Sequence, residues 1–414
     1  MTTAATTDSG TDLDAVLFIT QYGAGGVERM MVQTARALAE RGLQIALVLA
    51  SHEGAYLDAL PRSVEQVILD PHRLADELTA FLAERRPVAA VSAKLGDDRT
   101  LIDARDRAKV STRVFFRVGN PLGYRLQARG ITPIGRWFKL RRMRALYRRA
   151  DGCIAVSKGI RDDLHGQLAV PDSRIQVLPN PVITPELYQR ADEDPGHPWL
   201  RAGEPPVVLG VGALRQQKDF GTLLQAFSGV RRRRECRLII LGEGRQRDRL
   251  EALAKQLGVA GDVDLPGWQG NAHAYMARAA VFALSSRWEG TANVIIEAAA
   301  LGIPIVATDC HYGPREVLQD GRYGELVPTR DPDALGRGIE RMLEHPRIHR
   351  IFSKLRSATV WTSPHGAMPE HSVLSPAPPI NGPDPCPEAP RDRGRHQAFA
   401  LSVVVVALRQ SSNS

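Results

Sequence analysis

Residues 281–302 read VFALSSRWEGTANVIIEAAALG: an apolar strand, a loop with one glycine, and an alanine-rich helix. The helix should end at Gly302, because glycine readily takes the left-handed conformation that closes helices. Glu289 then lies on the loop and Glu297 in the first turns of the helix, so both can reach a pocket at the carboxyl end of a sheet, where open α/β folds bind ligands. Carboxylates accept hydrogen bonds from vicinal hydroxyls, which favours ribose and hexose recognition. Two glutamates at this spacing are otherwise most often a solvated surface.

Strand-like and helical runs alternate over most of the chain, which predicts parallel α/β architecture. At 414 residues the chain exceeds the size of a single core, so two domains are expected. Residues 13–183 form the first domain, and residues 207–345 form the second. Residues 184–206, rich in Pro, Asp and Glu and without periodicity, are interpreted as the linker. The first twelve residues and the Pro-rich residues 346–414 are predicted to be disordered.

The expected strands share an apolar run followed by glycine or polar residues. In the first domain they cover residues 15–20, 44–50, 88–93, 114–118, 153–157 and 175–182. In the second they cover residues 207–212, 237–241, 263–265, 281–284, 305–308 and 325–327. Helices are expected between them, for example over residues 27–41, 220–231, 248–257 and 333–344.

The formal net charge of +8 favours an anionic partner: nucleotide phosphates, lipid phosphates or nucleic acid. The cysteines are scattered, which argues against zinc sites and disulfide frameworks and fits a reducing compartment; they are Cys153, Cys236, Cys310 and Cys386. The first residues lack a basic and an apolar region, so no signal peptide is predicted. The longest apolar run, residues 398–408, is too short to span a bilayer. A cytoplasmic protein is expected.

A glycine-rich loop, residues 23–26, separates the first strand from the first helix. Gly25 and Gly26 allow backbone N–H groups to approach an oxyanion, and the helix dipole adds positive potential. The loop is not a dinucleotide fingerprint, because Glu28 occupies the third glycine position, and it is not a P-loop, because no Gly-Lys-Ser/Thr follows. A plain tight turn is the alternative.

Two cations, Arg215 and Lys218, follow the first strand of the second domain. Both could neutralise a diphosphate at the same sheet edge as the glutamates; two exposed loop cations are the alternative. Gly242 and Gly244 are interpreted as structural, the first in a tight turn and the second opening the next helix. Trp268 could flank a nucleobase, although a lone tryptophan is more often a core or rim residue.

The helix predicted over Arg136–Arg149 is strongly basic. Its apolar residues are interpreted as one broad face; they are Trp137, Leu140, Met143, Ala145, Leu146 and Tyr147. Such helices often lie on anionic membranes, and a domain helix with a solvated basic face is the alternative. Nucleic-acid binding is disfavoured, because the aromatic stacking platforms of single-strand binders are missing.

Asp-x-Asp patterns, which metal-dependent sugar transfer uses, begin at Asp192, Asp262 and Asp331. The first falls in the linker, and the third begins a helix, where aspartate caps. We interpret all three as chance and predict no metal and no cofactor. No Ser/His/Asp set has a recognisable context, so no nucleophile is assigned.

With these pieces in place, the chain resembles a family-4 retaining glycosyltransferase of the GT-B type over residues 13–345. The combination of motifs carries the resemblance, and no single motif would. They are Gly25-Gly26-Val27-Glu28-Arg29, Val156-Ser157-Lys158-Gly159, Leu178-Pro179-Asn180-Pro181, residues 212–218, Leu241-Gly242-Glu243-Gly244, residues 289–302, Thr308-Asp309-Cys310, Gly313-Pro314-Arg315-Glu316 and residues 320–327.

The resemblance implies two Rossmann-like parallel-sheet domains facing a cleft that binds a nucleotide-sugar. Glu297 would hold the ribose hydroxyls and Glu289 the donor sugar, while Arg215 and Lys218 bind the diphosphate and stabilise the departing nucleotide. The sugar is also contacted by the backbone of four residues: Thr291, Ala292, Asn293 and Val294. Gly25 and Gly26 would meet the phosphates. Retention without a protein nucleophile is the mechanism the resemblance implies.

Two departures from the family stand out. Many relatives place a histidine in a first-domain loop near the sugar; here that loop is Arg117-Val118-Gly119-Asn120, so Arg117 and Asn120 are the substitutes. Relatives also end with a helix that crosses back onto the first domain, whereas this pattern fails near Arg350. A changed reading frame or a replaced C-terminus would account for it, and loss of that helix would leave apolar surface uncovered.

The sequence therefore predicts transfer of a hexose-type sugar, with retention, from a nucleotide-sugar, UDP-linked, to a glycan or lipid-linked acceptor in cell-surface polysaccharide or lipopolysaccharide synthesis. Residues 136–149 would add peripheral contact with the inner face of an anionic membrane. The alternatives are a GT-B-like nucleotide-sugar epimerase or hydrolase, which would need an acid/base set, and a non-catalytic membrane-surface protein. A nicotinamide oxidoreductase is disfavoured by the missing fingerprint.

Overall fold

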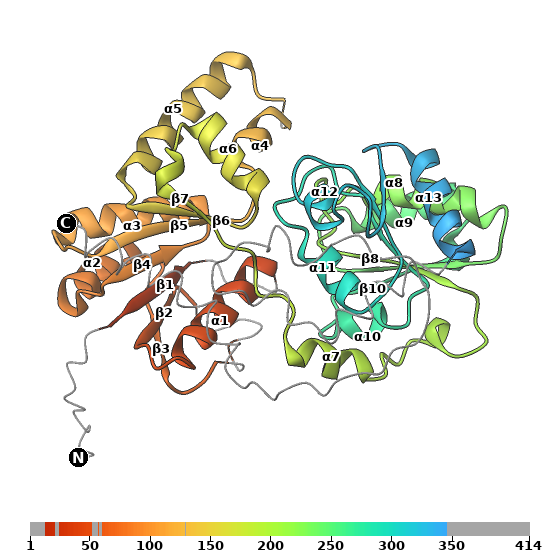
Figure 1. The fold of residues 1–414 in the computed structure, drawn as a ribbon, viewed down its shortest axis with the longest axis horizontal. Helices are drawn as coiled ribbons and strands as arrows, with labels where there is room; N and C mark the ends of the chain where they lie inside the picture. Colours follow the sequence, from red (N-terminus) through yellow and green to blue (C-terminus); the bar gives the residue numbers. More distant parts are fainter. Residues whose placement is uncertain (1–12, 21–24, 52–56, 58–59, 129, 346–414) are drawn as a thin grey trace, which may run out of the picture. The chain divides into compact units, whose positions relative to one another are not determined.

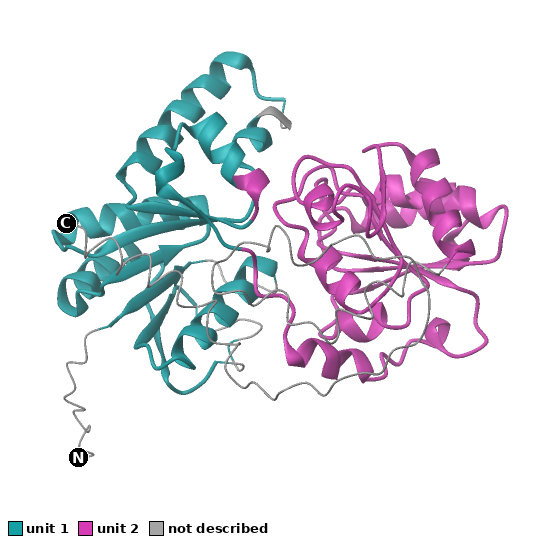
Figure 2. Ribbon diagram, in the orientation of Figure 1, with its two compact units in different colours: residues 1–156, 161–178, 362–414 teal, residues 157–160, 179–361 magenta. Residues whose placement is uncertain are grey.

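A computed structural model describes residues 13–20, 25–51, 57, 60–128 and 130–345. The chain divides into two compact units (Figure 2). Unit 1 holds the described residues up to 156 together with 161–178, and unit 2 holds 157–160 and the described residues from 179 onward. The first twelve residues and the Pro-rich tail, with the place near Arg350 where the family's pattern was expected to fail, lie outside the described residues, as do Gly23 and Ala24.

Unit 1 is built on a parallel sheet of seven strands in the described residues, in the order β3-β2-β1-β4-β5-β6-β7. The strands are β1 (Ala15–Ile19), β2 (Ile45–Leu49), β3 (Val64–Ile68), β4 (Ala89–Ser92), β5 (Arg113–Val118), β6 (Gly152–Ala155) and β7 (Ile175–Val177). The central strands β1 and β2 are buried along their whole length, as expected for apolar runs covered on both faces. The strand order reverses between β1 and β4, and the carboxyl ends of strands at such a switch point are where open α/β sheets bind ligands.

The helices of unit 1 cover both faces of this sheet (Figure 1). They are α1 (Gly26–Ala39), α2 (Leu74–Arg85), α3 (Leu95–Ala108), α4 (Leu122–Ala128), α5 (Pro133–Arg149) and α6 (Lys158–Leu168), with a short 3-10 turn, η2 (Asp172–Arg174). Helix α1 packs on β1, β2 and β3, and α3 packs on β1, β4 and β5. Met31, Ala35 and Leu38 of α1 enter the core with the β1 side chains, which fixes the start of α1 relative to the sheet.

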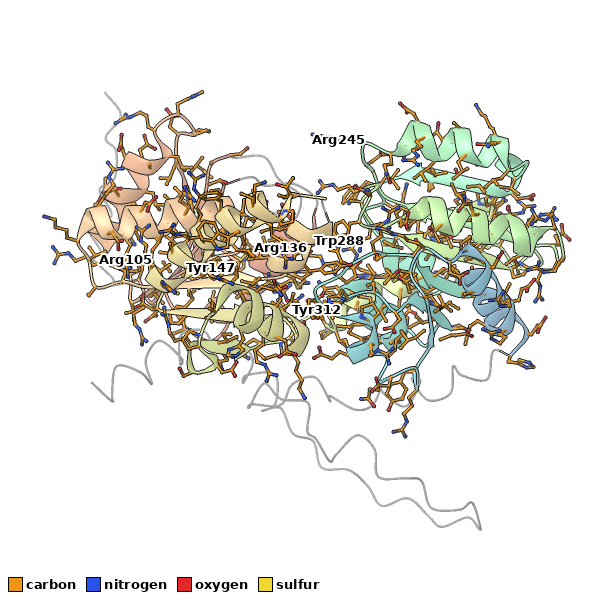
Figure 3. All side chains as sticks on the ribbon, turned by 90° about the horizontal axis from the view of Figure 1, so that it is seen from above. Arg105, Arg136, Tyr147, Arg245, Trp288 and Tyr312 are labelled. Carbon is orange, nitrogen blue, oxygen red and sulfur yellow. The ribbon has the colours of Figure 1, made fainter. Side chains whose placement is uncertain are left out.

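The apolar face predicted for α5 is only partly right. Leu140, Met143, Leu146 and Tyr147 are buried against unit 1, whereas Trp137 is exposed on the outer side. Tyr147 lies in the interior of unit 1 (Figure 3), edge-on to Phe116 with ring centroids 5.1 Å apart. Ala145 is exposed as well. The helix is therefore a domain helix on its apolar side, because the core of unit 1 already covers that side.

Unit 2 repeats the plan with a parallel sheet of six strands among the described residues, in the order β10-β9-β8-β11-β12-β13. The strands are β8 (Val207–Val211), β9 (Arg237–Leu241), β10 (Val263–Gly267), β11 (Val281–Leu284), β12 (Ile305–Thr308) and β13 (Glu325–Val327). The order reverses between β8 and β11, so the loops that leave these two strands meet at the switch point. These strands match the predicted ones closely, because each is a short buried apolar run.

Helices α8, α9 and α13 lie on one side of the unit 2 sheet and α10 on the other (Figure 1). The bounds are α7 (Pro185–Asp192), α8 (Phe220–Arg231), α9 (Arg247–Gln256), α10 (Ala272–Met276), α11 (Asn293–Ala300), α12 (Pro314–Val317) and α13 (Pro332–Glu344), with 3-10 turns η3 (Pro198–Leu200) and η4 (Ala260–Asp262). Asp331 caps α13 by accepting a hydrogen bond from the backbone N–H of Ala334 at 2.8 Å, as expected for the third Asp-x-Asp pattern.

Two elements differ from the sequence expectation. Strand β3 was not predicted, because only Val64 is buried in it and its edge position tolerates the polar Glu65 and Gln66. Helix α7 falls within the stretch interpreted as an aperiodic linker. Leu187 and Ala191 of α7 are buried, and the helix packs on α10. One short apolar face suffices there, since α10 supplies the opposing surface.

Candidate active site

The loops after β8 and β11 bring two predicted site residues into direct contact. Lys218 Nζ lies 2.6 Å from Glu289 Oε1, and the side chains are 16% and 8% exposed. Ser286 Oγ also donates to Glu289 Oε1 at 2.6 Å. The carboxylate therefore has two donors on one oxygen, which orients it in a largely buried position.

Further contacts join the same two loops. Arg287 forms a two-point ion pair with Asp219, through Nε to Oδ2 at 2.9 Å and Nη2 to Oδ1 at 2.8 Å. Ser285 Oγ donates to the carbonyl of Lys218 at 2.7 Å, and the Arg287 N–H donates to the Gln217 carbonyl at 2.8 Å. Lys218 is thus held by its backbone as well as by its side chain, which is the support a charge-stabilising residue requires.

Glycines make room for this pair. A Cβ on Gly212, whose φ is +155°, would lie 2.9 Å from Cε of Lys218. A Cβ on Gly313, at φ +83°, would meet Cβ of Glu289 at 3.2 Å. Gly242 has φ +141° and a position where a Cβ would lie 2.1 Å from the Gly212 carbonyl oxygen. Gly244 serves a similar close backbone approach, to Leu214, and α9 begins only at Arg247, so the expectation that Gly244 opens the helix is wrong.

Helix α11 presents an N-terminus without a side-chain cap. Ala292 stands at the cap position with φ +56°, a left-handed conformation that is uncommon for alanine. No acidic residue lies in the first turn, so the dipole of the helix is not offset by its own sequence. Thr291 is buried, while Asn293 and Val294 are partly exposed, and Asn293 Oδ1 accepts a 2.7 Å hydrogen bond from Asn180 Nδ2. The N–H groups of a helix start without a side-chain cap suit an anion or a hydroxyl oxygen.

Glu297 lies in the second turn of α11 and is 2% exposed. His273 of α10 lies beside it, with 3.8 Å between Nε2 and Glu297 Oε2. A ligand can touch only a small part of this carboxylate. That geometry fits a few hydrogen bonds to hydroxyls better than an open ion pair.

Arg215 and Trp268 sit at the same sheet edge, after β8 and β10 respectively. Arg215 is exposed, and no ion pair of its side chain occurs in the described part of the chain. Trp268 is 47% exposed. The Arg215 carbonyl accepts a hydrogen bond from the Lys218 N–H at 3.0 Å, and among the described residues no side-chain contact joins Arg215 or Trp268 to the Lys218–Glu289 pair. Arg215 thus presents an exposed cation at this edge, and Trp268 presents an exposed aromatic ring.

At the corresponding edge of unit 1, an acidic residue of α1 offsets the positive potential at the start of that helix. Gly25 precedes α1 with φ −86°, and Gly26 is its exposed first residue. Glu28 lies in the first turn, largely buried, and Lys94 Nζ is 2.7 Å from its Oε1. Because Glu28 offsets the dipole of α1, the loop attracts an anion less strongly than an isolated helix N-terminus would.

Arg117 lies inside β5 and is buried, so its expected loop position is wrong. Burial lowers its pKa to about 10. Asn120, two residues past the strand end, is partly exposed. Residues 114–118 are buried throughout and mostly apolar, so the strand includes Arg117 and continues to Val118.

Among the described residues, no group of three or more His, Cys, Asp or Glu could hold a metal ion. Cys153, Cys236 and Cys310 are buried and unbridged, and burial raises the pKa of the Cys236 thiol to about 11. Tyr312 and Trp288 both belong to unit 2 (Figure 3). No helix in the described ranges is long and apolar enough to cross a membrane.

The sequence interpretation missed several residues that build the site. Ser286 and the Asp219–Arg287 pair hold Glu289 and Lys218 in place, and Asn180 reaches Asn293. Ser286 could have been found from its position directly after a buried strand. Asn180 lies 113 residues from its partner, so no local pattern shows the contact.

Comparison with known families assigns both halves of the chain. Residues 24–185 match the model described as Glycosyltransferase Family 4, and residues 197–356 match Glycosyl transferases group 1. Together they cover the two α/β units and the motifs that carry the predicted resemblance, which is thereby confirmed.

Curated relatives share part of the chain. A Campylobacter jejuni N-acetylgalactosamine-N,N'-diacetylbacillosaminyl-diphospho-undecaprenol 4-alpha-N-acetylgalactosaminyltransferase is 32% identical over 207 residues, 50% of this chain and 54% of that protein. Lipopolysaccharide core biosynthesis glycosyltransferase LpsE of Rhizobium meliloti is 38% identical over 138 residues, 33% of this chain and 39% of that protein. The chain thus spans about half the length, or less, of these relatives.

Solved structures show the same fold. HepE of Anabaena, in complex with UDP and glucose, superimposes with a TM-score of 0.64 at 17% identity, over 96% of this chain and 98% of that one. At this identity the likeness concerns the fold alone. It confirms the predicted GT-B class, with two parallel-sheet α/β units.

Proposed function

Because the chain belongs to the group 1 glycosyltransferases, we propose that it transfers a hexose-type sugar from a nucleotide-sugar to a glycan or lipid-linked acceptor. The observation that carries the proposal is the Lys218–Glu289 pair beside the uncapped N-terminus of α11, at the switch point of the unit 2 sheet. A cation, a carboxylate and free N–H groups at one edge match the diphosphate and the hydroxyls of such a donor.

In this proposal the donor lies along the carboxyl edge of unit 2. Lys218 and the exposed Arg215 bind the diphosphate and stabilise the charge that develops on it as the sugar departs. Glu289 binds the transferred sugar, with the backbone of residues 291–294, and Glu297 binds the ribose. Trp268 stacks on the base. Gly25 and Gly26 contribute N–H groups from unit 1, and Arg117 and Asn120 contact the sugar or acceptor.

Retention fits the proposed chemistry. Glu289 shares one oxygen with Lys218 and Ser286, and a carboxylate held by two donors is a weak nucleophile. We therefore favour front-face substitution, in which the acceptor hydroxyl enters on the side from which the diphosphate leaves. The leaving phosphate can accept the proton of that hydroxyl, so atoms and charge balance without a metal or cofactor.

The donor and acceptor classes draw support from the relatives. HepE was solved with UDP and glucose, which favours a UDP-linked hexose here. The names of the Campylobacter and Rhizobium proteins refer to a diphospho-undecaprenol and to lipopolysaccharide core, which favours cell-surface polysaccharide or lipopolysaccharide synthesis. A lipid-linked acceptor places the enzyme at the inner face of the membrane, as a cytoplasmic protein with peripheral contact.

The test is a screen of nucleotide-sugars for donor hydrolysis and for transfer to lipid-linked acceptors, with Glu297→Ala as the control. We expect one UDP-sugar to be turned over, with an increase on addition of acceptor and retained anomeric configuration by NMR. Unchanged turnover in Glu297→Ala would reject the site assignment. Acceptor-independent turnover alone would instead support the hydrolase alternative.

A further inference from the structure

The outer face of α5 is open although its inner face is occupied. Leu140, Met143, Leu146 and Tyr147 pack into unit 1. The opposite side carries Ile134, Trp137 and Phe138 in the first turns, exposed to 72%, 52% and 55%. Among the described residues, these three neighbours are the most exposed of the six exposed large hydrophobic side chains. Such clustering on one helix is unusual for a surface that faces only water.

The following turns of the same face are cationic. Arg141, Arg144 and Arg148, with Ala145 between them and Trp137 at one end, line a hollow of about 410 Å³. The Arg141 guanidinium lies 5.5 Å from the centroid of the Trp137 ring. The three arginines are three or four residues apart, so their heads lie on one line along the helix.

The charge of this face is not compensated within unit 1. Helix α5 contains seven Lys and Arg residues and no Asp or Glu. Arg149 pairs with Asp103 and Asp106 on α3. Lys139, Arg141, Arg142 and Arg148 make no ion pair in the part of the chain that the structure describes. Arg144 donates from Nε to the Gln167 carbonyl at 3.1 Å but has no acidic partner in the described residues. A cation row without acidic partners beside exposed aromatic rings has the chemistry of an interfacial helix.

We propose that this outer face docks on an anionic lipid bilayer, with Ile134, Trp137 and Phe138 entering the interface and Arg141, Arg144 and Arg148 holding lipid phosphates. Tryptophan prefers the headgroup level of a bilayer, and arginine pairs with phosphate through two N–H groups. The apolar tip precedes the cationic row along the helix, so α5 meets the membrane tilted with its N-terminal end deeper. The proposal refines the peripheral location given above, and it can be measured without the sugar-transfer reaction.

Vesicle sedimentation with the full chain tests the proposal. We expect binding to vesicles of phosphatidylglycerol and phosphatidylcholine, weak binding to phosphatidylcholine alone, and release by added salt. Arg141→Gln with Arg148→Gln should lower binding roughly 25-fold, because each basic side chain near an anionic surface contributes about five-fold. The matched control is Arg249→Gln with Lys255→Gln on α9, two exposed cations of unit 2 that should leave binding unchanged.

The apolar tip has its own test. Lipids with brominated acyl chains should quench the tryptophan fluorescence of the wild type, and Trp137→Phe should lose most of that quenching. The double variant Ile134→Ser with Phe138→Ser should shorten the time that the protein stays bound to a vesicle. It should not alter the thermal unfolding midpoint or donor hydrolysis in solution. If both sets of variants bind anionic vesicles like the wild type, the proposal is overturned. Protection of α5 by inorganic pyrophosphate without any vesicle binding would also overturn it and indicate a soluble anion site.

Discussion

The carboxyl edges of the two sheets have the same strand topology, but the charged residues at the two edges are arranged differently. In unit 2 the loops at the switch point hold a cation against a carboxylate, and Arg215 beside them lacks an ion pair among the described residues. Helix α11 starts there without an acidic residue in its first turn. In unit 1 the equivalent helix α1 carries Glu28 in its first turn, matched by Lys94. At the unit 2 edge, the positive potential of the helix start remains available to an anionic ligand. At the unit 1 edge, Glu28 offsets the potential of α1.

The carboxylates of α3 extend this difference. Asp97 accepts a 2.5 Å hydrogen bond from Thr20 Oγ1. Asp98 is buried and accepts hydrogen bonds from Ser92 Oγ at 2.7 Å and from Tyr147 OH at 3.2 Å. Asp97 and Asp98 are both buried, so these carboxylates bind to neighbouring hydroxyls inside unit 1. Two sheets of the same topology thus use their charged residues differently: unit 2 keeps an exposed cation at its edge, whereas the carboxylates of α3 in unit 1 are used for packing.

The largest effect should come from removing one cation at each edge. Lys218→Met should lower kcat about 10²–10³-fold, because the departing diphosphate loses a fixed positive charge. Lys94→Met should mainly lower the unfolding midpoint, since Glu28 is left largely buried and unpaired. Single-turnover kinetics and thermal unfolding of both variants, with exposed Lys255→Met as the control, separate the two roles. Equal losses of kcat at Lys218 and Lys94 would break the comparison.

A second effect concerns the buried carboxyl of unit 1. Burial is the main cause that raises the pKa of Asp98, to about 7 from the ordinary 3.8. The folded state therefore binds the proton more tightly than the unfolded state, so the stabilisation is complete below about pH 4 and is lost as the pH rises through 7. Between these values the unfolding free energy should fall by roughly 2–4 kcal/mol through this group.

Asp98→Asn removes that titration. Urea unfolding of the wild type and the variant across pH 4–8 should show curves that converge at low pH and separate in favour of the variant near pH 7. Parallel profiles would show that Asp98 does not govern the pH dependence of unit 1. Donor affinity should not follow this titration, because the donor is assigned to unit 2.

The third effect tests ribose binding. Glu297→Gln should weaken UDP binding about 10–100-fold, since hydrogen bonds to a charged group contribute about 1.5–3 kcal/mol. Asp97→Asn, the buried carboxylate at the edge of unit 1, is the matched control and should leave the UDP affinity unchanged. Titration calorimetry measures both. Equal weakening in the two variants would place the nucleotide differently.

The sequence was sufficient where a local pattern determines structure. Short buried apolar runs predicted the strands of unit 2, and the stretch around Glu289 predicted a strand, a loop and helix α11. Edge strand β3 and helix α7 were missed, because their stability comes from neighbours rather than from their own apolar content. The Lys218–Glu289 contact joins residues 71 apart and follows from strand order, which motifs alone do not state. The proposed roles of these residues stay predictions.

The smallest effect probes backbone strain at the two helix starts. Ala292 is left-handed, with φ +56°, whereas Gly25 has φ −86°, which any residue can adopt. Ala292→Gly should raise stability by about 1 kcal/mol, because the left-handed conformation costs a non-glycine residue about 1–2 kcal/mol and glycine's added freedom in the unfolded chain cancels part of that gain. Gly25→Ala should not gain stability, since its Cβ would lie 2.5 Å from Glu28 Oε2 and displace that carboxylate.

Thermal unfolding of these two variants shows whether each substitution raises or lowers stability. Ala299→Gly inside α11 is the control and should lose about 1 kcal/mol of stability. If Ala292→Gly also lowers donor turnover, the strained residue holds the α11 N–H groups in the geometry that the donor requires. If stability rises and turnover is unchanged, the strain at unit 2's edge is unrelated to donor binding. In that case the difference between the two edges rests on charge alone.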